Sequence, residues 1–120
     1  MIEAQSLATN DQLIKNGETW SLALQEFIER GGVIVLLEGP GGSNDGTYQI
    51  LKAAGLFNAA ARVSVGRKQL TLAAPSDAVA TAVPTFYQGG VETVGFDINE
   101  STVVVRDDDT GIPVVLHIAR

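Results

Sequence analysis

The sequence contains no cysteine. This absence excludes disulfide bonds, thiolate metal sites and a cysteine nucleophile, and it leaves the redox compartment undetermined. Charged side chains are also scarce, at 18% of the 120 residues, whereas 45% of the residues are hydrophobic. A chain of this composition is not intrinsically disordered. Because a typical domain takes about 100–200 residues, we predict a single domain over residues 1–120, either complete or incomplete.

Basic residues are few. Eight Lys and Arg stand against fourteen Asp and Glu, which gives a formal net charge of −6. Only Arg67 and Lys68 are adjacent. Because neutralising nucleic-acid phosphates requires clustered basic side chains, we expect no nucleic-acid partner.

Long hydrophobic runs are absent as well. No apolar stretch approaches the roughly 20 residues that a membrane-spanning helix needs, so we expect no membrane insertion. The first five residues lack the basic region and apolar run of a signal peptide. We therefore expect a cytoplasmic location by default, unless the natural chain extends upstream of Met1. We also expect no cofactor and no metal site.

The first half of the chain has the pattern of an α/β protein. Residues 6–17 are polar and predict a loop. A helix is predicted over residues 19–30, with Thr19 as its N-cap and Gly31 at its end. Its apolar side chains recur at helical spacing on one face: Trp20, Leu24, Phe27 and Ile28. The continuous apolar run at residues 33–37 is typical of a strand that is covered on both faces.

A glycine-rich loop follows this run, and a second helix is predicted over residues 47–54. For the rest of the chain we predict a hairpin of residues 62–66 and 69–73, a helical turn over 75–82 capped by Ser76 or Asp77, a strand over 91–97, and a terminal hairpin of 102–106 and 113–118. The predicted fold is therefore α/β, with a mixed sheet. Its first half is parallel with flanking helices, and it ends in an antiparallel hairpin.

The glycine-rich loop carries the candidate ligand-binding residues. They are Gly39, Gly41, Gly42, Ser43, Asn44 and Thr47. The spacing of Gly41, Gly46 and Thr47 is similar to that of a phosphate-binding loop, but the lysine before the hydroxyl residue is missing. Backbone N–H groups at this turn could bind an anion. We favour a plain tight turn, because a glycine loop without its reactive side chain is weak evidence. Glu38, at the end of the preceding run, either points to solvent or faces the loop, where its carboxylate would oppose an anion.

Catalytic residues are harder to find in the sequence, and we predict none. A hydrolase would use Ser43 or Thr47 as its nucleophile, but the Gly-x-Ser-x-Gly pattern is absent. The only histidine, His117, lies on a predicted terminal strand, where we expect a structural role. Three aspartates at residues 107–109 could suggest calcium, yet their spacing is not that of a calcium loop, so we expect a solvated turn.

Two segments resemble a known family. Residues 20–36, an amphipathic helix that enters an apolar strand through Gly31 and Gly32, resemble a recurrent segment of class I glutamine-amidotransferase-like domains. Residues 74–84 resemble a segment of their trehalose-utilisation-type and uncharacterised bacterial relatives. The resemblance implies a flavodoxin-like α/β fold. It implies no catalytic residue, because the loop at residues 39–46 lacks the cysteine that the catalytic members carry on the corresponding turn.

In that family, one or two βα units precede the helix that is matched here. By the resemblance, the chain corresponds to the C-terminal part of such a domain, either shortened or naturally reduced. A sheet without its leading strands has an exposed edge and an uncovered apolar face. We therefore expect a non-catalytic binding or structural module that forms a homo-oligomer, or pairs with a partner chain that completes the sheet. The alternatives are a small-ligand or anion-binding protein that uses residues 39–47, and a hydrolase.

Overall fold

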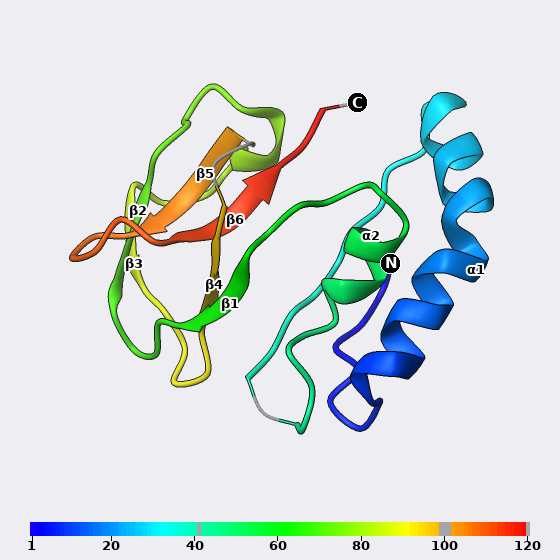
Figure 1. The fold of residues 1–120 in the computed structure, drawn as a ribbon. Helices are drawn as coiled ribbons and strands as arrows, with labels where there is room; N and C mark the ends of the chain where they lie inside the picture. Colours follow the sequence, from blue (N-terminus) through cyan, green and yellow to red (C-terminus); the bar gives the residue numbers. More distant parts are fainter. Residues whose placement is uncertain (41, 99–101, 120) are drawn as a thin grey trace. The chain divides into compact units, whose positions relative to one another are not determined.

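In a computed structural model, the contacts divide the chain between Ala59 and Ala60 into two units. The structure describes residues 1–40, 42–98 and 102–119. Among these residues the first unit, Met1–Ala59, holds the two α-helices, and the second, Ala60–Ala119, holds the six strands (Figure 1). Each unit has buried apolar side chains of its own. None of the helices in these ranges is long and apolar enough to cross a membrane.

Helix α1 spans Asn10–Glu29 and begins well before the predicted start. Its N-cap is Thr9, whose hydroxyl accepts the Gln12 N–H at 3.2 Å, while the Gln12 side chain accepts the Thr9 N–H at 2.9 Å. This reciprocal pair is a capping box. The prediction of a loop over residues 6–17 with Thr19 as N-cap was wrong, because the first turns of the helix carry few apolar residues. Gly31, with φ of 86°, lies just past the helix end, as predicted.

The short helix α2, Gln49–Ala53, packs closely against α1. The closest approach is at Gly17, where an added Cβ atom would lie 2.2 Å from the Ile50 carbonyl oxygen. Leu13 and Ile50 are buried beside this contact. At the other end of α2, the Ser21 hydroxyl and the Gln25 amide both donate to the Ala54 carbonyl at 3.1 Å. A glycine in the middle of α1 is therefore what allows the two backbones to approach.

The apolar run at residues 33–37 is not the covered parallel strand that its composition predicts. Its only bridge is a single parallel one, between Ile2 and Leu36. Val33 is 78% exposed, and the side chains of Val35 and Leu37 are also exposed. Within the described residues both sheets are antiparallel, so the predicted α/β fold with a parallel first half is wrong. One bridge cannot bury the faces of a strand as flanking strands and helices would.

The strands of the second unit form two antiparallel sheets (Figure 1). Strands β1 (Ala61–Ser64) and β4 (Val94–Asp97) make a two-stranded sheet. The other sheet has the order β3-β2-β5-β6, with bounds Phe86–Gln88, Gln69–Leu72, Thr102–Asp107 and Pro113–His117. A buried apolar cluster in the second unit consists of Val65, Leu70, Ala80, Val104 and Val105. Strand β3 therefore lies at one edge of the larger sheet.

The pairing of the first strands differs from the prediction. The segments at 62–66 and 69–73 do contain β1 and β2, but these strands do not pair with each other. The N–H groups of Val65 and Gly66 both donate to the Thr93 carbonyl, so the chain leaving β1 stays bound to the segment before β4. The predicted strand over 91–97 begins only at Val94. The antiparallel terminal hairpin is confirmed as β5 and β6.

The helical turn predicted after β2 is a short 3-10 helix, η1, at Ala78–Ala80. The Asp77 carboxylate caps it by accepting the Val79 N–H at 2.8 Å. Asp77 was one of the two predicted caps.

Candidate functional site

The predicted ligand-binding residues lie in the loop before α2, and those that the structure describes differ in exposure. Gly41 lies outside the described residues. Gly42 and Ser43 are exposed, and Gly39 is half-buried. Gly42 has φ of 77°, and an added Cβ there would lie 2.2 Å from the Ser6 carbonyl oxygen. A glycine is therefore needed at position 42 for the turn itself. A ligand-binding role for these residues stays a prediction.

The other two predicted residues, Asn44 and Thr47, are buried and bonded to the N-terminal segment. Asn44 is 7% exposed, and its amide donates to the carbonyls of Gln5 and Ala8 at 2.8 Å. Thr47 is 1% exposed, and its hydroxyl accepts the Gln5 N–H at 2.7 Å. The two side chains are themselves buried, so these bonds satisfy polar groups that would otherwise cost free energy. Asn44 and Thr47 therefore attach the loop to the N-terminal segment, which is a structural role.

The carboxylate of Glu38 accepts two backbone N–H groups of the loop. One oxygen accepts the Gly39 N–H at 3.1 Å, and the other accepts the Tyr48 N–H at 3.0 Å. An added Cβ at Gly46 would lie 2.8 Å from the second oxygen. Two backbone donors of the turn thus already bind a negative charge from the chain itself, which opposes a bound phosphate.

A histidine–carboxylate pair lies in the second unit. His117 Nδ1 is 2.9 Å from Asp77 Oδ2 and 3.1 Å from Oδ1. Since an ionised carboxylate only accepts, Nδ1 carries the proton. This bond and the Val79 N–H lower the pKa of Asp77. A base with its orienting acid is part of a hydrolytic triad. However, no hydroxyl in the described parts of the chain hydrogen-bonds to His117.

The aspartates at residues 107–109 form the turn between β5 and β6. Asp108 and Asp109 are exposed, as expected for a solvated turn, but Asp107 is completely buried. Its carboxylate accepts from the Thr110 hydroxyl and from the Asp109 N–H, and it lies 3.6 Å from Lys68 Nζ. The Thr110 bond is the main reason why the pKa of Asp107 is lowered despite burial. No group of three metal-ligating side chains occurs among the described residues.

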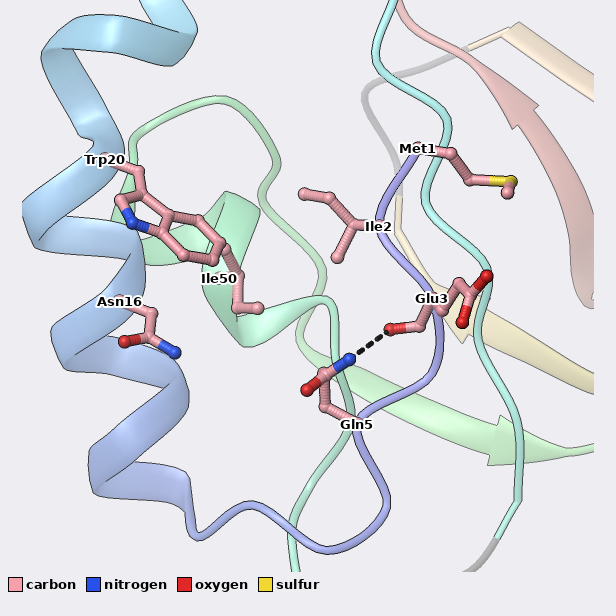
Figure 2. Close-up of a pocket in the computed structure, with 7 residues that line it drawn as sticks. All are labelled: Met1, Ile2, Glu3, Gln5, Asn16, Trp20 and Ile50. Atoms are coloured by element: carbon pink, nitrogen blue, oxygen red, sulfur yellow. Dashed lines mark hydrogen bonds between the residues drawn. The ribbon is translucent and has the colours of Figure 1, made fainter.

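A pocket in the first unit combines an aromatic wall with amide groups. Its volume is about 300 Å³. The lining residues are Met1, Ile2, Glu3, Gln5, Asn16, Trp20 and Ile50 (Figure 2). Asn16 and Trp20 are one helical turn apart on α1, so they share a face. The sequence predicts Trp20 on the apolar face of its helix, yet it is 43% exposed. The pocket itself was not predicted.

A second open cavity, of about 420 Å³, lies along the edge strand β3. It is lined by Gln69, Phe86, Tyr87 and Gln88. Phe86 is 58% exposed. We did not predict this strand, although Phe and Tyr favour β-structure and a proline just before them marks a possible strand start.

No protein-family model matches the chain, and no match is found among curated proteins or solved structures. The resemblance to amidotransferase-like domains therefore stays a prediction.

Proposed function

We propose that the chain is a non-catalytic module that associates with a second copy of itself by pairing at the outer edge of β3. The observation that carries this proposal is the direction of the backbone groups along that strand. The Leu72 N–H donates to the Thr85 carbonyl at 2.9 Å, and the Gly89 N–H donates to the Lys68 carbonyl at 2.8 Å. Leu72 belongs to β2, while Thr85 and Gly89 flank β3 and Lys68 precedes β2, so both bonds join the β2 side to the β3 side.

In an antiparallel ladder, bonded positions alternate along each strand. The bonds at Thr85 and Gly89 therefore turn the backbone of Tyr87 toward β2, in agreement with its pairing with Leu70. Phe86 and Gln88 consequently present their N–H and C=O groups to the outer edge. No other segment of the described chain is paired with this edge.

The outward groups are arranged symmetrically about Tyr87. In an antiparallel pair of two copies related by a two-fold axis at Tyr87, Phe86 of one copy lies opposite Gln88 of the partner subunit. In this register every outward N–H meets a carbonyl. The pairing also covers the exposed Phe86 side chain. Because β3 has only three residues, we expect reversible association in the micromolar range rather than an obligate dimer.

Two further observations support a non-catalytic role. Thr47, one of the two nucleophiles considered for a hydrolase, is buried and bonded to the Gln5 backbone. The carboxylate of Glu38 weighs against anion binding at the same loop. The proposal does not use the amidotransferase resemblance, because the sheets that pair here are antiparallel.

Substitution at Gln88 tests the proposal. Gln88→Pro removes an outward N–H but no bond to β2, and proline is tolerated on edge strands. Gln88→Ala is the matched control, because it removes the same side chain and keeps the N–H. By size exclusion with light scattering from about 10 to 200 μM, we expect the unmodified chain and Gln88→Ala to associate and Gln88→Pro to remain monomeric.

Two results would contradict the proposal: a monomeric unmodified chain throughout this range, or a Gln88→Pro variant that associates as strongly as Gln88→Ala. Circular dichroism of the three proteins establishes that the proline variant is folded. A charge at the edge, Phe86→Lys, provides a second test, since two copies would then bring like charges close to the shared edge.

A further inference from the structure

The pocket beside Trp20 has an apolar side and a polar side. In Figure 2 the Trp20 ring is directed toward Ile2 and Ile50, and these three residues form the apolar side. Asn16 and Gln5 supply amide groups on the polar side. A volume of about 300 Å³ is at the lower end of the range for small-molecule sites, which suits a single small ring.

The polar groups of this pocket remain able to bind a ligand. The Gln5 amide nitrogen donates to the Glu3 carbonyl at 3.1 Å, which fixes the side chain and leaves its amide oxygen as an acceptor. Within the described chain, no hydrogen-bond partner is found for the Asn16 amide. That amide offers both a donor and an acceptor. Ligand hydroxyls, which donate and accept, match both residues.

The pocket favours an uncharged ligand. Its charged groups are the Glu3 carboxylate, which Figure 2 shows turned away from Trp20 and Ile2, and the α-amino group of Met1, which has the opposite sign. Neutral amides and apolar walls do not compensate for removing a charge from water. The Trp20 ring, by contrast, provides a flat apolar surface for the C–H groups of a saturated ring.

From these features we propose that the pocket binds a neutral pyranose sugar, with one C–H face of the ring against Trp20 and hydroxyls bonded to Asn16 and Gln5. The proposal is independent of self-association, since the residues that line this pocket belong to the first unit and those of β3 to the second.

Trp20 is the only tryptophan in the chain, so its fluorescence reports on this pocket alone. We titrate the full chain with D-glucose, D-galactose and D-mannose. The expected result is a saturable change in emission with at least one of them and a Kd in the millimolar range. Acyclic sorbitol controls for solvent effects. Cationic D-glucosamine and anionic D-glucuronate should bind about tenfold more weakly than the parent sugar.

Asn16→Leu should weaken binding about tenfold, because it keeps the size of the side chain and removes its hydrogen bonds. Lys15→Leu, at the neighbouring exposed position, should bind normally. Circular dichroism establishes that α1 is intact in both. The proposal is overturned if no neutral pyranose gives a saturable change in emission, or if sorbitol gives the same change. It is also overturned if the charged sugars bind as tightly as the parent sugar, or if Asn16→Leu binds the sugar as tightly as the unmodified chain.

Discussion

The imidazole of His117 binds both carboxylate oxygens of Asp77, at 2.9 and 3.1 Å, across forty residues of sequence. The same carboxylate caps η1 through the Val79 N–H. One side chain thus fixes a short helical turn and joins it to the last strand of the sheet. The Asp77 side chain is 11% exposed, so this contact lies near the surface of the second unit.

The stability of the chain should fall in acid because of Asp77. Its pKa is lowered from the ordinary value of 3.8, mainly by the bond to His117. A carboxyl with a lowered pKa binds fewer protons in the folded state, so its contribution is complete above about pH 4–5 and is lost as the pH falls through the folded pKa. Asp77→Asn should be less stable near pH 6 and should show a flatter decline below about pH 4. Urea unfolding at a series of pH values measures both effects.

The matched control for this experiment is Asp97→Asn, an exposed carboxyl at the end of β4. It should keep the acid decline of the unmodified chain. An Asp77→Asn variant with the same decline as that control would show that the pair with His117 has no such role.

Asp107 should be the most important of the three turn aspartates for stability. Its buried carboxylate is bonded to the Thr110 hydroxyl and the Asp109 N–H and lies near Lys68. Asp107→Ala leaves these donors without their acceptor, so we expect a loss of about 2–3 kcal/mol in the free energy of unfolding. Asp108→Ala removes one exposed bond to Thr71 and should cost less than about 1 kcal/mol. Equal losses in urea unfolding would contradict this account.

Gly17→Ala should destabilise the first unit, although alanine is the better helix former. In an open helix this change would add about 1 kcal/mol of stability. Here the new Cβ would lie 2.2 Å from the Ile50 carbonyl oxygen, and overpacking of this kind typically costs about 1–3 kcal/mol. Ala23→Gly, at an exposed position of α1, measures the helix propensity alone. A stabilised Gly17→Ala variant would mean that α1 and α2 do not approach as described.

Thr47 should matter for folding rather than for chemistry. Thr47→Val keeps its shape but removes the acceptor of the Gln5 N–H, at a cost of about 1–2 kcal/mol. Thr47→Ser keeps the hydroxyl and should retain most of that contribution. Thermal unfolding compares the two variants. If both are equally stable, the hydroxyl has no structural role, and a role in ligand binding gains support.

Several local features of this fold are predicted from the sequence because neighbouring residues determine them, although the start of α1 at its Thr9 cap was missed. Gly31 has positive φ at the end of α1, where the sequence places it. Asp77 caps its turn, and β5 and β6 pair across a predicted loop. In each case the determining factor is local: a glycine that can adopt positive φ, or a side chain that accepts a hydrogen bond from a backbone N–H a few residues away.

Pairing between distant segments was not predictable in this way. The continuous apolar sequence of residues 33–37 predicted a covered strand. The burial of a strand depends on which segments pack against it, however, and among the described residues only Ile2 forms a bridge with this run. Similarly, β1 and β2 are close in sequence, yet β1 pairs with β4 through contacts around Thr93. The Trp20 pocket was missed because its lining comes from three separate segments: residues 1–5, helix α1 and helix α2.

The order of strands in the larger sheet has a consequence for synthesis of the chain. Strand β5 lies between β2 and β6, although it is made only after β2, β3 and β4. While the ribosome is still adding residues 102–107, β2 lacks the partner on one of its sides, and such an edge favours aggregation. Among the described residues the first unit contains no such late segment, since these residues are all made by Ala59. A nascent chain can therefore complete its helical half early, while its larger sheet waits for residues 102–107 to emerge.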